Sequence, residues 1–171
     1  MKKGGVGGAN TLTGLRFEER ISLRTAISQL SGFEVIGDEV CFNGEKVAHL
    51  FTKHKLYKNL LELRGINHTT FISKKLLPDE AILVENTLFI VEMKFQFVAG
   101  SVDEKLQTCH FKKRQYTKLF SKTDIDVEYI YVLNDWFRKP EYKDVLEYIK
   151  DVGCYYFFNE IPLDFLGLAG E

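Results

Sequence analysis

The sequence has few cysteines: Cys41, Cys109 and Cys154 are the only ones among its 171 residues. Their number is odd, their spacing is wide and no CxxC pair occurs, so the sequence predicts neither a disulfide framework nor a zinc site. This cysteine usage favours a reducing, cytoplasmic setting. No apolar run approaches the length of a membrane span, and the glycine-rich first residues lack the apolar core of a signal peptide. We therefore expect no membrane partner.

Several other signals are missing. The early glycines do not follow a GxGxxG spacing and no strand precedes them, which argues against a dinucleotide loop. The four histidines form no metal-ligand pattern. The net charge of −1 gives no global sign of nucleic-acid binding, but the charge is unevenly distributed. Residues 1–122 hold 19 Lys and Arg against 13 Asp and Glu, and residues 123–171 hold 4 against 11. This asymmetry fits either one basic face that contacts phosphates or scattered surface charge.

The length of 171 residues fits a single compact domain with a sizeable core. Residues 1–12 are expected to be either a flexible basic arm that becomes ordered on a DNA backbone or a disordered terminus.

Two strands joined by a tight turn, at residues 80–85 and 87–97, are the most informative stretch. Both are rich in β-branched and aromatic residues, and turn-forming residues separate them. If residues 86–87 form the turn, Asp79 lies opposite Lys94, on the polar face of the second strand. A slip of one residue would send Asp79 to the other face, so this expectation depends on the turn.

The polar face of the second strand carries Glu92, Lys94 and Gln96, and the alternate positions form an apolar face. With Asp79 added, two carboxylates and an ammonium group converge. Such a cluster suits metal-assisted phosphodiester hydrolysis, because two carboxylates bind Mg²⁺ through oxygen and leave it several waters. The lysine can orient or deprotonate the attacking water. A solvated polar row, with ordinary turn chemistry at Pro78-Asp79, is the alternative.

The segments LLPDEAILV and FIVEMKFQ resemble the PD-(D/E)XK nuclease superfamily, with Pro78-Asp79 and Glu92-Met93-Lys94 at the motif positions. The resemblance implies that Asp79 and Glu92 ligate Mg²⁺, helped by the backbone carbonyl of Met93. It also implies that Lys94 positions or activates the water. Mn²⁺ is expected to substitute for Mg²⁺.

A first helix is expected from about residue 13 to residue 30, with Thr13 as a candidate N-cap and an apolar stripe at helical spacing. In the superfamily, a glutamate on the first helix often joins the site. The segment GLRFE at residues 14–18 resembles that helix, which makes Glu18 a further catalytic candidate. Gln96 is a second possible helper.

Between this helix and the hairpin, the sequence predicts two short strands, a hairpin turn, a return strand and a short basic helix, at residues 33–36, 39–42, 43–44, 46–51 and 53–65. Compact members of the superfamily reach the PD motif much sooner, so the resemblance implies that residues 37–75 are an inserted segment. Its basic residues are either DNA contacts or an exposed cationic face. The candidates are Lys53, Lys55, Lys58 and Arg64.

Ser101 and Glu104 have the spacing of a capping box, which predicts a helix from there to about Phe120. The segment GSVDEKLQTCHFKKRQY resembles the corresponding part of small type II restriction endonucleases, where a basic helix approaches the DNA backbone. A solvated helix face is the alternative. The DNA-contact candidates on this helix are Lys105, Gln107, Lys112, Lys113 and Arg114.

A buried strand at 127–133, a helix from 140 to about 150 and a last strand at 154–158 complete the expected order. The predicted class is α/β (α+β), with a central mixed sheet flanked by helices. The order resembles the αβββαβαβ arrangement of the restriction-endonuclease-like core, with the catalytic core at residues 76–158.

These features together predict a Mg²⁺-dependent, sequence-specific DNA endonuclease of the type II restriction class. The resemblance implies that it hydrolyses double-stranded DNA to leave 5′-phosphates. One site per domain implies a homodimer for a double-strand cut, and a restriction enzyme implies a cognate DNA methyltransferase. A Holliday-junction resolvase or repair nuclease of the same superfamily, and a catalytically silent DNA-binding module, are the alternatives.

Overall fold

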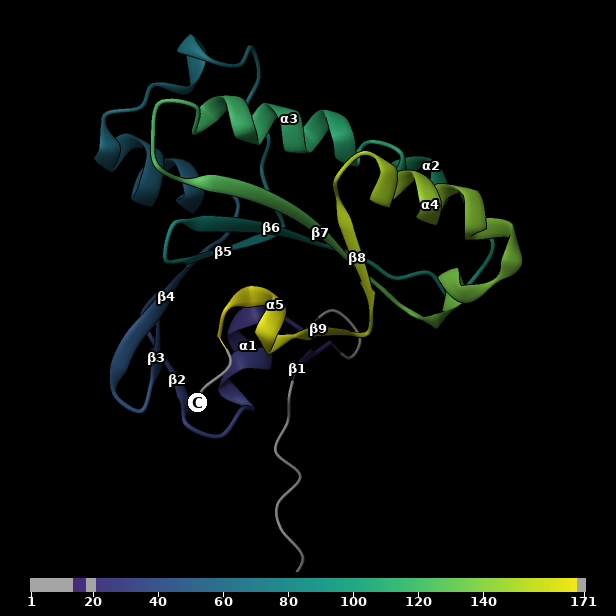
Figure 1. Cartoon of the computed structure of the whole chain (residues 1–171), viewed down its shortest axis with the longest axis horizontal. Helices are drawn as coiled ribbons and strands as arrows, with labels where there is room; N and C mark the ends of the chain where they lie inside the picture. The colour runs from purple at the N-terminus through teal and green to yellow at the C-terminus, as the bar shows by residue number, and fades with distance from the viewer. Residues whose placement is uncertain (1–13, 18–20, 169–171) are drawn as a thin grey trace, which may run out of the picture.

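A seven-stranded sheet forms the centre of the computed structural model, which describes residues 14–17 and 21–168 (Figure 1). The strands lie side by side in their order along the chain. Neighbouring strands are antiparallel from β2 to β6, whereas β6, β7 and β8 are parallel. The strands are β2 (Phe33–Ile36), β3 (Glu39–Phe42), β4 (Glu45–Phe51), β5 (Glu80–Val84), β6 (Thr87–Lys94), β7 (Asp126–Leu133) and β8 (Tyr155–Phe158).

Helices cover both faces of this sheet (Figure 1). One face is covered by α2 (Val102–Leu106), α3 (Cys109–Leu119), α4 (Lys143–Asp151) and the π-helix η1 (Tyr57–Leu61). The other is covered by α1 (Leu23–Ser28), α5 (Leu163–Leu166) and a small antiparallel pair of strands, β1 (Gly14–Arg16) and β9 (Glu160–Pro162). Short 3₁₀ segments complete the chain: η2 (Glu62–Arg64), η3 (His68–Thr70), η4 (Asp135–Arg138) and η5 (Pro140–Tyr142).

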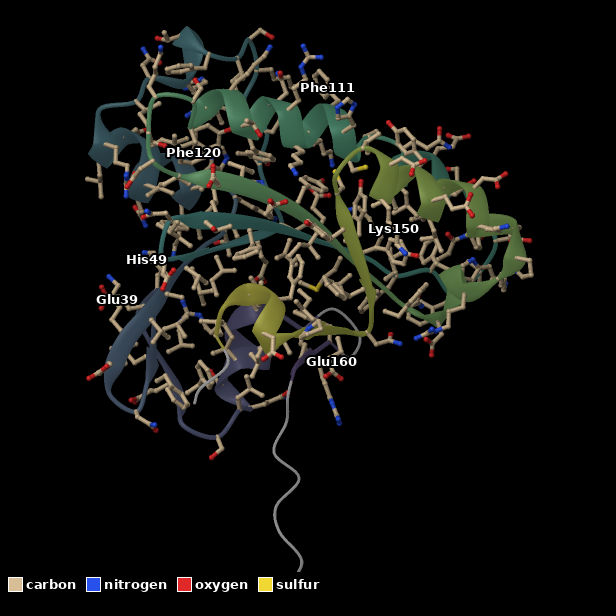
Figure 2. All side chains as sticks on the ribbon, viewed as in Figure 1. Glu39, His49, Phe111, Phe120, Lys150 and Glu160 are labelled. Atoms are coloured by element: carbon tan, nitrogen blue, oxygen red, sulfur yellow. The ribbon has the colours of Figure 1, made fainter. Side chains whose placement is uncertain are left out.

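The sheet divides the core into two clusters, and side chains fill the space on both of its faces (Figure 2). In β6, Leu88 and Ile90 pack under α3, whereas Phe89 and Val91 pack on the side of α1 and α5. All four are buried. Both faces of β6 are therefore apolar over most of its length, and polar residues appear only toward its C-terminal end.

The predicted class, a mixed α/β protein with a central mixed sheet flanked by helices, is confirmed. The predicted strands at 33–36 and 39–42 are confirmed as β2 and β3. The segment 37–75, expected as an insertion, supplies β3 and β4 to the central sheet and η1 to the core. No helix in the described part of the chain combines the length and apolar character needed to span a membrane.

The single helix predicted from residue 13 to residue 30 is wrong. Within its described part, Leu15 lies in β1, paired with Ile161 of β9, and α1 begins only after its N-cap Ser22. Leu15 and Phe17 are both buried at the alternating spacing of a strand. A partner strand near the C-terminus thus overrides the local helical pattern. Thr13 and the arm at residues 1–12 lie outside the described residues.

The predicted helix from Ser101 to Phe120 is two helices, α2 and α3, separated at Gln107-Thr108. The carbonyl of Lys105 accepts hydrogen bonds from the Thr108 hydroxyl (2.8 Å) and the Tyr131 hydroxyl (3.2 Å). These side chains compete with the helical backbone for that carbonyl, which accounts for the break. The expected capping box is also absent, because the Ser101 side chain makes no capping hydrogen bond.

Candidate active site

The hairpin of β5 and β6 sets the position of the site. Its turn is Glu85-Asn86, with Val84 paired to Thr87, so the predicted turn at residues 86–87 is wrong by one position. Glu85, the first residue of the turn, has a positive φ of 50°, and β6 begins at Thr87, directly after the turn. The register moves by two residues, and extended one position beyond its end pair, Glu80 with Val91, it places Asp79 opposite Glu92 instead of Lys94. Because strand side chains alternate with a period of two, Asp79 stays on the predicted face.

Three predicted site residues come together at the C-terminal end of β6. The Nζ atom of Lys94 lies 3.0 Å from Oε2 of Glu92 and 3.6 Å from Oδ2 of Asp79. The Asp79 side chain is 48% exposed, whereas that of Glu92 is only 6% exposed. Asp79 therefore faces solvent at the entrance, and Glu92 lies deeper with Lys94 between them.

Glu92 is a buried carboxylate with two cationic partners. Besides Lys94, it accepts hydrogen bonds from Lys112 Nζ, at 3.2 Å from Oε1 and 3.1 Å from Oε2. Burial raises the pKa of Glu92, but the positive charges of Lys94 and Lys112 outweigh it, so the pKa lies below its ordinary value. Burial and the nearby charge of Glu92 raise the pKa of Tyr129, whose hydroxyl has no hydrogen-bond partner among the described residues. Glu92 is therefore ionised and Tyr129 is neutral.

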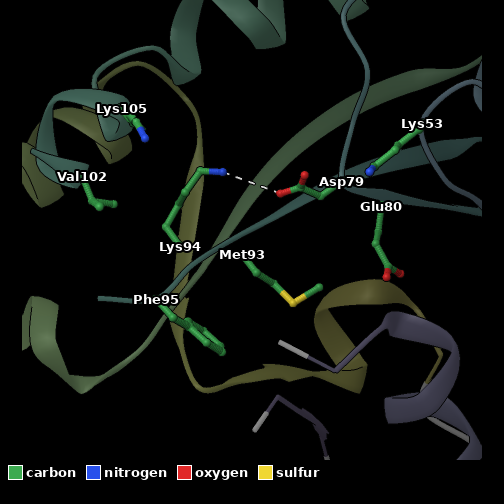
Figure 3. A pocket seen from close by; sticks show the side chains of 8 residues that line it. All are labelled: Lys53, Asp79, Glu80, Met93, Lys94, Phe95, Val102 and Lys105. Atoms are coloured by element: carbon green, nitrogen blue, oxygen red, sulfur yellow. Dashed lines mark ion pairs between the residues drawn. The ribbon is translucent and has the colours of Figure 1, made fainter. Parts of the chain in front are cut away.

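A pocket of about 440 Å³ opens over this cluster (Figure 3). Figure 3 shows Asp79 and Lys94 facing each other across it, with Lys53 beside Asp79 and Lys105 on the side of Lys94. Three ammonium groups and two carboxylates, those of Asp79 and Glu80, thus line one opening. The lining residues are Lys53, Asp79, Glu80, Met93, Lys94, Phe95, Val102 and Lys105.

The donor set fits a hard divalent cation that keeps most of its water. Asp79 and Glu92 both lie within 4 Å of one ammonium group, so a positive charge already occupies the space between them. Mg²⁺ is commonly held by one or two carboxylates together with waters and substrate phosphates. Among the described residues, no group of three or more His, Cys, Asp and Glu could form an all-protein metal cage. Asp79 and Glu92 are therefore the two carboxylates of this site that could ligate such a cation.

The predicted DNA contacts divide into three groups. Lys53 and Lys105 line the pocket, and Lys58, Gln107 and Arg114 are exposed. The remaining four pair with carboxylates. Lys55 pairs with Asp38 (3.0 Å), Arg64 with Asp124 (3.5 Å) and Lys113 with Glu128 (3.1 Å), while Lys112 contacts Glu92.

Gln96, a predicted catalytic helper, is buried and holds the loop that follows β6. Its Nε2 donates to the carbonyl of Val98 (2.8 Å) and, at a longer distance, to that of Gly100 (3.4 Å). Asn134, after β7, donates to the carbonyl of Gln96 (2.7 Å) and accepts from its backbone N–H (3.2 Å). The side chain of Gln96 thus positions the loop beside the pocket. Glu18, the other predicted helper, lies outside the described residues.

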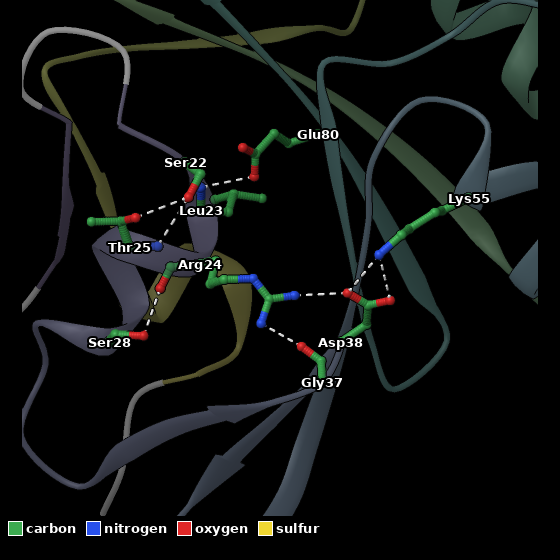
Figure 4. Close-up of polar contacts among 9 residues, drawn as sticks. All are labelled: Ser22, Leu23, Arg24, Thr25, Ser28, Gly37, Asp38, Lys55 and Glu80. Atoms are coloured by element: carbon green, nitrogen blue, oxygen red, sulfur yellow. Dashed lines mark hydrogen bonds and ion pairs between the residues drawn. The ribbon is translucent and has the colours of Figure 1, made fainter.

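Sequence reasoning missed Glu80, the neighbour of Asp79. Its Oε2 accepts a hydrogen bond from the backbone N–H of Leu23 (2.8 Å), at the start of α1 (Figure 4). Burial raises the pKa of Glu80 to about 7, although the Leu23 amide opposes this shift. Arg24 of α1 pairs with Asp38 (2.7 Å), which also binds Lys55. No local signal links Glu80 to an amide 57 positions earlier in the chain.

Comparison of the chain with protein-family models, with curated proteins and with solved structures finds no match.

Proposed function

We propose that this protein is a Mg²⁺-dependent endonuclease that hydrolyses phosphodiester bonds of DNA. One observation carries the proposal: Asp79, Glu92 and Lys94 converge at the end of β6, beneath a pocket that Lys53 and Lys105 also line. The residues that resemble the PD-(D/E)XK motif therefore share one site, although 13 positions separate Asp79 from Glu92.

The two carboxylates would hold the metal. Asp79 lines the pocket and is exposed, and Glu92 is buried and ionised behind Lys94, so the two carboxylates offer oxygen ligands on either side of one ammonium group. The backbone carbonyl of Met93 is a third candidate ligand. When bound there, Mg²⁺ would neutralise charge on the phosphate and lower the pKa of a coordinated water.

Lys94 would act on the attacking water. It lies between both carboxylates and its side chain is 19% exposed, so its ammonium group reaches the pocket without being fully solvated. A lysine so placed can orient the water and stabilise negative charge as the water oxygen attacks phosphorus. The P–O3′ bond then breaks, which leaves a 5′-phosphate and a 3′-hydroxyl.

Lys53 and Lys105 would hold the DNA backbone. They lie at opposite sides of the pocket, in the loop after β4 and in α2 (Figure 3). Ammonium groups on both sides of the attacked phosphate can contact the phosphates before and after it on the same strand. Such contacts position the strand without reading its sequence.

The finer assignment is a type II restriction enzyme, with a restriction-endonuclease-like fold, a homodimeric state and a cognate DNA methyltransferase as partner. Its support is the resemblance of the motif and of the segment after it. One site cuts one strand, so a double-strand break needs two protomers or two binding events.

Incubation of the purified protein with a large natural duplex DNA and Mg²⁺ tests this function. Glu92→Gln removes one ligand charge, and Glu39→Gln is the matched control, because Glu39 forms an exposed pair with Lys46. We expect discrete fragments with 5′-phosphates from the wild type and from Glu39→Gln, but none from Glu92→Gln.

The pattern of products also decides between related activities. Cutting of a four-way junction but not of linear duplex would assign the site to a junction resolvase. If the folded wild-type protein cuts neither substrate at any Mg²⁺ concentration, the nuclease function is wrong.

A further inference from the structure

Glu92 and Asp79 differ in how their carboxylates are occupied. Both oxygens of Glu92 lie 3.1–3.2 Å from Lys112 Nζ, and Oε2 also lies 3.0 Å from Lys94 Nζ. The only ion pair of Asp79 among the described residues is with Lys94, at 3.6 Å. One of the two carboxylates that would hold a metal is therefore already bound to a lysine from a different element, α3.

Lys112 is suited to leave Glu92. Its side chain is 27% exposed and ends in a compact charge on a flexible stem, so the ammonium group can reach solvent without unfolding α3. A divalent cation at Glu92 would lie close to this ammonium group and be repelled by it. Binding of the cation thus requires that Lys112 move or be neutralised by another anion.

The charge balance identifies that anion. The carboxylates of Asp79 and Glu92 only offset the ammonium groups of Lys94 and Lys112, and Lys53 and Lys105 add further positive charge at the pocket. A divalent cation adds two positive charges, and a DNA phosphate that enters the adjoining pocket, lined by Asp79 and Lys94, can offset them. A phosphate also gives Lys112 a new partner.

We propose that Lys112 couples metal binding to DNA binding at this site by exchanging its ion pair with Glu92 for one with a DNA phosphate. We call this exchange the latch. In the free protein Lys112 holds Glu92 and opposes metal uptake. When DNA enters, Lys112 transfers to a backbone phosphate and releases Glu92 to the metal. The inference rests on the proposed nuclease function, and it adds that metal and DNA bind cooperatively, each raising the affinity for the other by the same factor.

Titration of Ca²⁺ into the full-length protein, followed by calorimetry, tests the latch. Ca²⁺ serves as the probe because it takes oxygen ligands, as Mg²⁺ does. The titration is run with and without a short duplex at low salt, and a gel checks that the duplex stays intact. Phosphate contacts do not depend on sequence, so the duplex needs no recognition site.

Lys112→Met is the test variant and Lys46→Met is the control, because Lys46 forms an exposed pair with Glu39 between β3 and β4. For the wild type and for Lys46→Met, we expect the duplex to tighten Ca²⁺ binding by about 10-fold, within the usual range of coupling. Lys112→Met should bind Ca²⁺ about 10-fold more tightly than the wild type without DNA and gain less than about 3-fold from the duplex.

Two results would overturn the latch in different ways. If folded Lys112→Met binds Ca²⁺ no more tightly than the wild type while the wild type cuts DNA, the latch is wrong and the nuclease function stands. If the wild type neither binds a divalent cation nor cuts DNA, both are wrong. Lys112→Gln is the second variant, and it serves if Lys112→Met does not fold.

Discussion

The ion pair between Glu92 and Lys112 makes a measurable prediction about stability. Glu92→Gln keeps the size of the side chain but removes its charge, so Lys112 loses its carboxylate partner and Lys94 keeps only Asp79. Lys112→Met removes one ammonium group, and Glu92 keeps Lys94. The double variant removes the pair together, so its cost should be smaller than the sum of the single costs.

The geometry sets the magnitude of this coupling. At a distance of 3.1 Å, an ion pair with an effective dielectric constant of about 20 is worth about 5 kcal/mol before desolvation. Removal of Glu92 from water, and partial removal of Lys112, offsets much of this energy and leaves a coupling of about 1–3 kcal/mol. We expect a loss of about 3 kcal/mol for Glu92→Gln and about 1 kcal/mol for Lys112→Met. The double variant should lose about 2 kcal/mol, instead of about 4 for independent changes.

Urea unfolding of the wild type, the two single variants and the double variant gives the coupling free energy. The four curves are fitted with one common slope of unfolding free energy against urea concentration. The exposed pair of Lys46 and Glu39 provides a control cycle, in which we expect a much smaller coupling. The effects of independent substitutions add to within about 0.5 kcal/mol, so a coupling below that value would refute a stabilising ion pair between Glu92 and Lys112. The latch inferred above would then lose its physical basis.

Three further predictions concern Glu80, Lys94 and Gly32. Because the pKa of Glu80 is raised from 4.5 to about 7, the folded state binds more protons there, and wild-type stability should fall as pH rises through this window. Glu80→Gln should remove that fall, as measured by urea unfolding at about pH 5 and about pH 8. Lys94→Gln should lower the single-turnover cleavage rate by about 10²–10⁴-fold without loss of duplex binding in a filter assay. Gly32→Ala should cost about 1–2 kcal/mol more in urea unfolding than Gly37→Ala. Both glycines have positive φ, but only at Gly32 would a Cβ meet a neighbour, the Phe42 ring at 2.7 Å.

The sequence was sufficient to predict the strands of the central sheet, though not β1 or β9, and to single out Asp79, Glu92 and Lys94, which meet in the structure. Runs of β-branched and aromatic residues predicted β2 and β3 at their observed ends, and alternation put Glu92 and Lys94 on one face. The wrong turn position did not change this result. It moved the register by two residues, which is one full period of a strand, so Asp79 still faces Lys94.

Only the tertiary structure decided which cations reach Glu92. Lys112 follows Glu92 by 20 positions and comes from a helix, and the approach of α3 to β6 depends on packing that no local pattern describes. The same is true of Leu15, where pairing with Ile161 of β9 replaced the expected helix, and of Glu80, which binds the amide of Leu23. Local periodicity fixes which way a side chain points along its own element. Contacts between elements distant in the chain depend on how their apolar faces pack together, and the folded chain alone sets them.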